Sequence, residues 1–280
     1  MMKSSHLLFF LFMTVFIHAT EPQKVVFAPL PALGQESIFK TFAPMVHYLE
    51  KTLHVSIHFH FTDSYEALLE DIKSGVVDIA YLGPLPYVKL KESFSFAQPL
   101  VFFNEADGKP HYRCVLVAWG DAFEPLSRLN PYHSFALTDP LSTCGYLAVS
   151  GVLRDAGYAL EEQPFSYLGK HDAVALSVVK GRFDYGGVKE DVARTYAHLG
   201  LSVVAQTEFI PSFALVANTQ KLSSTLQKEM TEALLNAPPS EFHTWGKEIR
   251  AGVSVAHDDA YTPVRIMRLE NIVSSQGAIR

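Results

Sequence analysis

The sequence predicts an α/β protein built from two lobes. Strand-like segments alternate with helical ones through most of the chain, as where "KVVFAPL" precedes apolar residues spaced three and four apart from Phe39 to Leu53. This alternation favours largely parallel sheets covered by helices. Two stretches interrupt it, at 104–111 and 206–212, and bracket about 95 residues. We therefore expect a second lobe inserted through two neighbouring crossings, an arrangement that forms a natural hinge.

The first residues have the pattern of an export signal. Lys3 precedes an unbroken apolar stretch from Leu7 to Ile17, and Ala19 is a small residue at a cleavage position. The stretch is too short to cross a bilayer as a helix; an uncleaved anchor is the alternative. We expect removal of residues 1–19 during export to the periplasm. The mature chain then divides into a discontinuous first lobe, 20–107 with 209–280, and an inserted second lobe, 108–208.

Acidic side chains outnumber basic ones in the mature chain. Without Lys3, 22 Lys and Arg stand against 29 Asp and Glu, a formal charge of −7. Nucleic acid and anionic lipid are poor partners for such a surface, so we expect no nucleic-acid partner. The two cysteines, Cys114 and Cys144, can oxidise to a disulfide after export, but the sequence does not show whether they lie close enough.

Residues 137–147, "LTDPLSTCGYL", combine a short strand, an Asp-Pro turn and a helix start. Ser142, Thr143 and Cys144 precede Gly145, which permits a close approach of backbone. Free N–H groups and hydroxyls at a helix start can bind an anion without a lysine or arginine. The alternative is an ordinary helix cap, for which one of these side chains suffices.

Four motifs in this order resemble the phosphonate/phosphite-binding family of periplasmic substrate-binding proteins, the solute receptors of ABC importers. They are "GVVDIAYLGPLPYV" (75–88), "DPLSTCGYL" (139–147), "GKHDAV" (169–174) and "GRFDYGGV" (181–188). The resemblance implies a two-lobed type II periplasmic binding protein fold, with mixed sheets flanked by helices and a ligand cleft between the lobes. We expect a monomer, not an enzyme and without a cofactor, that closes over a small phosphonate-like oxyanion and delivers it to the importer's membrane subunits.

The resemblance also implies the residues of the site. In the family, a Ser-Thr-Ser run, a tyrosine of the first lobe and the His and Asp of two motifs hold the oxyanion. The corresponding residues here are Ser142, Thr143, Cys144, Gly145, Tyr65, Tyr87, His171 and Asp184. Two positions depart from the family pattern: Cys144 replaces a serine, and Tyr185 replaces a small residue. A thiol donates weakly and a phenol fills volume, so the ligand can differ from a phosphonate.

Several of these residues have structural alternatives. Tyr65 shares the apolar face of its helix with Leu68, Asp184 can serve as a turn residue, and His171 can cap a helix. Tyr87 follows "GPLP", which predicts a turn that faces the cleft. The dipole at a helix start disfavours the imidazolium form of His171, whereas a bound oxyanion favours it.

Three other functions stay open. Cys144 with His171 as base would outline a nucleophile, although no motif such as G-x-S-x-G is present. A periplasmic ligand sensor for a membrane kinase would need the same open and closed states. Donors suited to iron(III) or another metal with an anion are also present: Tyr65, Tyr87, Tyr185, His171 and Asp184.

Overall fold

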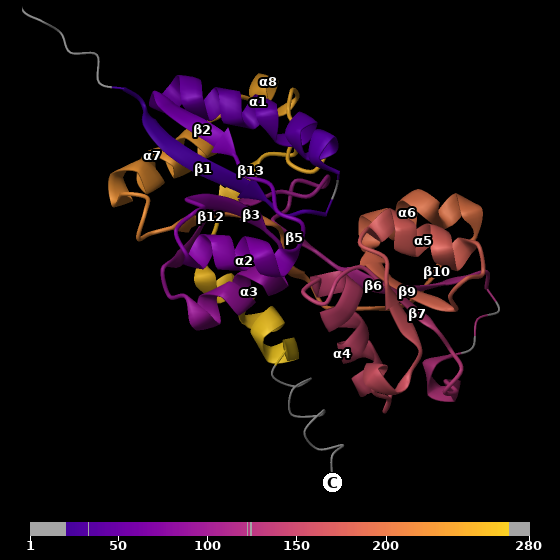
Figure 1. Cartoon of the computed structure of the whole chain (residues 1–280). Coiled ribbons are helices and arrows are strands. Elements are labelled where there is room, and N and C mark those ends of the chain that lie inside the picture. Colours follow the sequence, from indigo (N-terminus) through magenta and orange to yellow (C-terminus); the bar gives the residue numbers. More distant parts are fainter. Residues whose placement is uncertain (1–20, 33, 122, 124, 269–280) are drawn as a thin grey trace, which may run out of the picture.

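The computed structural model describes residues 21–32, 34–121, 123 and 125–268, and it contains two large sheets (Figure 1). The predicted export signal, residues 1–19, lies outside the described residues. The first sheet has the strand order β13-β4-β12-β3-β1-β2. Its strands are β1 (Gln23–Pro29), β2 (Val55–Phe59), β3 (Ile79–Leu82), β4 (Ala97–Phe103), β12 (Ala214–Asn218) and β13 (Val253–Val255).

The second large sheet has the strand order β10-β6-β9-β7-β8 and is built from the middle of the chain. Its strands are β6 (Cys114–Trp119), β7 (Phe135–Leu137), β8 (Phe165–Tyr167), β9 (Tyr185–Lys189) and β10 (Leu201–Gln206). Figure 1 shows this sheet and its helices as a separate lobe beside the first sheet.

The chain passes between the sheets twice, and the two passages pair with each other. β5 (His111–Tyr112) and β11 (Ile210–Pro211) form a two-stranded antiparallel sheet in which Ile210 lies opposite Tyr112. β11 lies within the second stretch where the alternation of strands and helices breaks, and β5 begins at the last residue of the first stretch. Paired crossings give two lobes a common axis for opening and closing.

Helices cover both faces of each large sheet (Figure 1). Apolar residues of α1 and α7 pack on one face of the first sheet, and those of α2 and α3 on the other. In the second sheet, α5 and α6 cover one face and α4 the other. The helices are α1 (Gln35–Leu53), α2 (Tyr65–Lys73), α3 (Pro84–Ser93), α4 (Ala148–Asp155), α5 (His171–Val179), α6 (Glu190–Tyr196), α7 (Ser224–Leu235) and α8 (Pro239–Phe242). Among the described residues, no helix has both the length and the apolarity that a membrane span needs.

The sheets are mixed, as the family resemblance implied, and less parallel than the strand and helix alternation suggested. β1 pairs in parallel with β2 and β3, and β7 with β8 and β9. β12 is antiparallel to its neighbours β3 and β4, and β6 is antiparallel to β9 and β10. β6 and β12 directly follow the two crossings. Each crossing leads the chain into its new sheet against the direction of the neighbouring strands, and this makes β6 and β12 antiparallel to them.

Candidate ligand-binding site

The candidate anion-binding turn lies between β7 and α4 and faces the first lobe. Ser142 caps the π-helical turn of residues 143–147, since its Oγ accepts a hydrogen bond from the backbone nitrogen of Gly145 at 3.0 Å. The backbone nitrogen of Leu85, in the first turn of α3, donates to Oγ1 of Thr143 at 3.0 Å. Ser142 and Thr143 are buried. The capping role therefore exists, and the same turn also contacts the opposite lobe.

The absence of a side chain at two glycines lets this turn pack against the second sheet. A Cβ at Gly145 would collide with the hydroxyl of Thr138 and lie 2.6 Å from its backbone nitrogen. A Cβ at Gly187, in β9, would lie 2.5 Å from the carbonyl oxygen of Cys144. Contacts this short do not occur in folded proteins, so both positions require glycine. The turn is thereby fixed to the end of β7 and to the middle of β9.

Cys144 forms a disulfide with Cys114, the first residue of β6, with the two Cα atoms 4.9 Å apart. Both residues are almost fully buried. A disulfide sulfur carries no hydrogen, so the side chain of Cys144 cannot donate to a ligand and only its backbone nitrogen remains for that role. The bond also removes the thiolate that the alternative catalytic function required.

Two tyrosines lie near this turn, one from the first lobe and one from the first crossing. Burial, and then the carboxylate of Asp139 beside the turn, raises the pKa of Tyr65. Burial, and then Glu105, raises the pKa of Tyr112, in the crossing strand β5, although a hydrogen bond with Thr143 acts in the opposite direction. Both side chains are buried. The predicted position of Tyr65 near the turn agrees with this geometry, and Tyr112 is a neighbour that the motifs did not indicate.

His171 begins α5, after β8, and lies at the same end of the second sheet as the turn, because β8 runs parallel to β7. Its Nδ1 is buried and has no hydrogen-bond partner within the described part of the chain. Burial, and then Lys189, lowers the pKa of His171 to about 4, although Asp191, Asp172 and a backbone hydrogen bond with Gly187 act in the opposite direction. The imidazole is therefore neutral near neutral pH. The hydrogen bond with Gly187 uses the other ring nitrogen, so Nδ1 is an acceptor in the neutral ring and donates to a ligand oxygen only when a bound oxyanion favours the imidazolium form.

The hydroxyl of Tyr87 is bonded within the first lobe and not to the turn. The residues after Gly83 form α3 rather than an open loop, because proline is accommodated in the first turn of a helix. Tyr87 is fully buried, donates a hydrogen bond to Asp258 Oδ1 at 2.5 Å, and packs its ring 4.1 Å from that of Tyr261. The structure thus places it in the core of the first lobe.

Asp184 and Tyr185 also lie away from the turn, at the opposite end of β7 and β9. The exposed carboxylate of Asp184 accepts hydrogen bonds from the backbone nitrogen and the hydroxyl of Ser134, both at 2.8 Å. Tyr185 is buried and stacks on Phe135, with ring centroids 5.2 Å apart. Asp184 is thus the turn residue that its alternative described, and Tyr185 fills the core instead of the ligand site.

These positions also weaken the alternative metal function. Of the proposed donors, Tyr87 bonds to Asp258, Asp184 bonds to Ser134, and the ring of Tyr185 stacks on Phe135. Among the described residues, no three His, Cys, Asp or Glu side chains gather into a group that could hold a metal ion.

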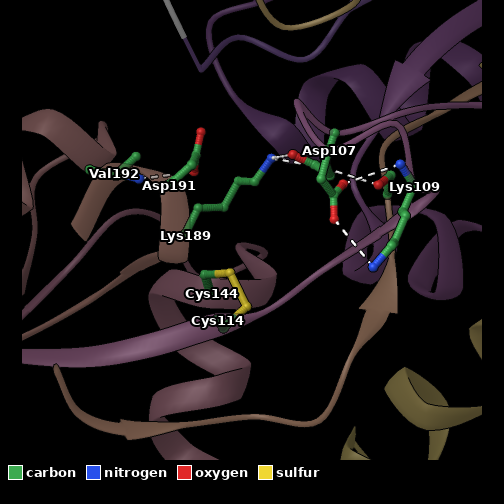
Figure 2. A network of polar contacts seen from close by, with 9 residues as sticks. Asp107, Lys109, Cys114, Cys144, Lys189, Asp191 and Val192 are labelled. Carbon is green, nitrogen blue, oxygen red and sulfur yellow. Dashed lines mark hydrogen bonds and ion pairs between the residues drawn. A yellow bond between two sulfur atoms is a disulfide. The ribbon is translucent and has the colours of Figure 1, made fainter. Parts of the chain in front are cut away.

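A lysine lies beside the candidate site, contrary to the expectation of a site without cationic side chains. Lys189 ends β9, and its Nζ lies 4.5 Å from the centroid of the Tyr112 ring. Figure 2 shows its side chain reaching from β9 toward the turn that carries Asp107 and Lys109, near the disulfide. One feature of the sequence could have indicated Lys189. It directly follows the motif "GRFDYGGV" and precedes a helix that begins at Glu190, and ligand sites often lie where a strand ends and the next helix begins.

A comparison with known protein families identifies the family of this chain. The model of the ABC transporter, phosphonate, periplasmic substrate-binding protein family matches residues 27–261. The chain belongs to this family. The match includes both large sheets and both crossings, so the family resemblance carried by the four motifs is confirmed.

Two curated relatives in the phosphonate-binding family match part of this chain. It is 26% identical over 179 residues to the "Phosphate-import protein PhnD" of Mycolicibacterium smegmatis, covering 59% of this chain and 54% of the relative. It is 29% identical over 140 residues to the "Phosphonates-binding periplasmic protein" of Escherichia coli, covering 46% of this chain and 40% of the relative. The matches thus span about half the length of these relatives or less.

Solved structures of similar proteins show the same fold. PhnD1 from Prochlorococcus marinus in complex with methylphosphonate has a TM-score of 0.73 at 18% identity, covering 89% of this chain and 99% of that one. A binding protein component of an ABC phosphonate transporter from Pseudomonas aeruginosa has a TM-score of 0.74 at 18% identity, covering 89% and 87%. The predicted two-lobed type II periplasmic binding protein fold is therefore confirmed.

The pKa of His171 predicts how the stability of this phosphonate-binding family member depends on pH. Because the folded pKa of about 4 lies below the ordinary 6.5, the unfolded chain binds more protons between these values. The contribution of His171 to the free energy of unfolding is therefore fully present above about pH 6.5. It falls by up to about 3 kcal/mol as the pH drops toward 4.

Urea unfolding of the wild type and of His171→Asn between about pH 7 and pH 4 isolates this contribution. The wild type should lose up to about 3 kcal/mol more stability than the variant across this range. Parallel pH profiles for the two proteins would show that His171 does not titrate in this way.

Proposed function

We propose that this protein is an exported, monomeric periplasmic solute-binding protein that captures a small phosphonate-class oxyanion and delivers it to the membrane subunits of an ABC importer. The family match over residues 27–261 is the observation that carries this proposal. The names of the relatives support it, since they are described as phosphonate-binding or phosphate-import proteins. In this proposal residues 1–19 are the export signal and 108–208 form a lobe inserted between 20–107 and 209–280.

The proposed ligand contacts come from the turn and its neighbours. Nδ1 of His171 can contribute when a bound oxyanion favours the imidazolium form. The hydroxyls of Ser142, Thr143 and Tyr65 and the backbone nitrogens of Thr143 and Cys144 supply uncharged hydrogen-bond donors, whereas the backbone nitrogens of Ser142 and Gly145 already donate within the turn. Hydrogen bonds from such groups to an oxyanion are shorter and stronger than those to a neutral acceptor. Tyr87 and Asp184 are left out of this set, because the structure gives them other partners.

Closure is the proposed mechanism, and the contact between Leu85 and Thr143 supports it. Pro84 and Pro86 have no N–H, so the backbone nitrogen of Leu85 is a rare donor at the start of α3, and Thr143 of the other lobe accepts its hydrogen bond. An oxyanion at this point can accept from Leu85 and from the turn together. A ligand held by both lobes favours the closed state through its differential affinity.

Isothermal titration of residues 20–280 tests the proposal. The panel contains methylphosphonate, phosphite, phosphate, methanesulfonate and iron(III) with each anion. We expect micromolar or tighter binding of at least one of the phosphorus oxyanions. Binding of methanesulfonate alone, of iron(III) alone, or of none of these compounds would contradict the proposed ligand class.

Removing the Thr143 hydroxyl should weaken oxyanion binding. Thr143→Val keeps the shape of the side chain but leaves the buried N–H of Leu85 without an acceptor and removes a donor for the ligand. We expect a loss of about 2 kcal/mol in the free energy of binding, the magnitude of one hydrogen bond to a charged group. Thr143→Ser is the matched control, because it restores the hydroxyl. Equal dissociation constants for the valine variant and the wild type would show that the residue only caps the helix.

A further inference from the structure

The ion pair of Lys189 and Glu105 joins the second lobe to the first crossing. Nζ of Lys189 lies 3.0 Å from Oε1 and 2.8 Å from Oε2 of Glu105. The two side chains are only 18% and 21% exposed. The hydroxyl of Ser212, in the second crossing, also donates to Oε1 of Glu105 at 3.0 Å. The carboxylate of Glu105 is therefore held at the hinge by the ammonium group of Lys189, from the second lobe, and by the hydroxyl of Ser212, from the second crossing.

The ammonium group of Lys189 lies against aromatic rings that border the candidate site. Its Nζ is 4.5 Å from the ring centroid of Tyr112 and 5.7 Å from that of Phe213. The phenol of Tyr112 is hydrogen-bonded to Thr143 of the turn. His171 also senses Lys189, whose charge helps to keep the imidazole neutral. The lysine thus lies beside the tyrosine that contacts the turn, and its charge acts on the histidine.

The surroundings of this ammonium favour exchange of its partner. A largely buried ion pair loses much of its hydration, and the attraction of one carboxylate offsets this cost only in part. An oxyanion with two negative charges attracts the ammonium more strongly at the same separation. Glu105 would keep the hydrogen bond from Ser212 after losing the lysine, so it would not be left without a partner.

We propose that Lys189 is a specificity-determining residue of the ligand site, that it selects a doubly charged oxyanion, and that Glu105 is the internal carboxylate which the ligand displaces from it. This inference rests on the proposed function, because it concerns the same turn and the same ligand class. It predicts that the two members of one ion pair have opposite effects on affinity. Lys189 strengthens binding, and Glu105 competes with the ligand.

The test compares Lys189→Met and Glu105→Gln by isothermal titration with methylphosphonate and methanesulfonate at about pH 8, where the first compound is mostly a dianion and the second carries one charge. Lys189→Met should weaken methylphosphonate binding by at least about tenfold and methanesulfonate binding by a smaller factor. Glu105→Gln keeps an acceptor for Ser212 and should strengthen methylphosphonate binding by about threefold or more.

Lys109→Met and Asp107→Asn are the matched controls, because they remove the same charges from a neighbouring exposed ion pair with 3.7 Å between Nζ and Oδ2 (Figure 2). We expect dissociation constants within about twofold of the wild type for both. Circular dichroism confirms that each variant is folded, and Glu105→Gln still decides the matter if Lys189→Met does not fold. If Glu105→Gln weakens binding or leaves it unchanged, the ion pair of Lys189 and Glu105 has only a structural role between the lobes, and the inference is wrong. If the wild type binds neither compound nor any other oxyanion, the proposed function fails first.

Discussion

Replacing Cys114 and Cys144 together with alanine should lower the free energy of unfolding by about 3.5 kcal/mol and weaken oxyanion binding by at least about tenfold. The stability loss follows from chain entropy, since the disulfide links residues 30 positions apart and restricts the unfolded chain. The removal of buried sulfur atoms adds a packing cost in the same direction.

The effect on binding has a separate cause in the position of the bond. The backbone nitrogen of Cys114 donates to Oγ1 of Thr207 at 3.1 Å, next to the second crossing. The disulfide therefore fixes the turn at Cys144 to both passages between the lobes. Without it, the donors of the turn lose their fixed position relative to the hinge, and preorganisation for the ligand is lost.

Urea unfolding and isothermal titration with methylphosphonate measure the two effects. Reductant provides the control: it should move the wild type toward the double-alanine variant and leave that variant unchanged. If the free energy of unfolding of the double variant is less than about 1 kcal/mol below that of the oxidised wild type, the bond does not have this structural role.

Gly145→Ala should have a comparably large effect, because the added methyl group meets backbone and not only a side chain. The new Cβ would lie 2.6 Å from the backbone nitrogen of Thr138, so the turn must move away from the end of β7. We expect a loss of about 3 kcal/mol in stability, at the upper end for overpacking, and at least about tenfold weaker binding.

Gly34→Ala is the matched control for this substitution. A Cβ at Gly34 meets nothing within 4 Å, so the same chemical change should cost less than about 1 kcal/mol, mainly through a poorer helix cap. Thermal or urea unfolding of the two variants measures the difference. Equal losses would mean that close packing of the turn does not hold it in place.

Periodicity alone identified most of the fold. The apolar spacing in α1 and the paired breaks in the alternation predicted the helix and the two crossings, because burial of one face and passage between cores both leave local patterns. The directions of β6 and β12 were harder to predict, because the pairing of a strand after a long crossing depends on contacts between residues far apart in sequence.

The positions of the candidate site residues were predictable in part, and the misses have two different causes. Ser142 to Gly145, Tyr65 and His171 lie in short motifs whose local structure already positions them. Tyr87 was assigned to a turn because its prolines were interpreted as breakers, although the first turn of a helix accepts them. Lys189 was missed because its partner Glu105 is 84 positions away, and the disulfide was left open because its geometry depends on the tertiary fold.

A crystal structure of residues 20–280 grown with methylphosphonate tests the central claim most directly. The claim predicts the phosphonate oxygens within hydrogen-bond distance of the backbone nitrogens of Thr143 and Cys144 and of His171, with a contact to the Leu85 nitrogen from the opposite lobe. A phosphonate bound by one lobe alone, or bound away from this turn while the turn keeps its contact with Leu85, would contradict it.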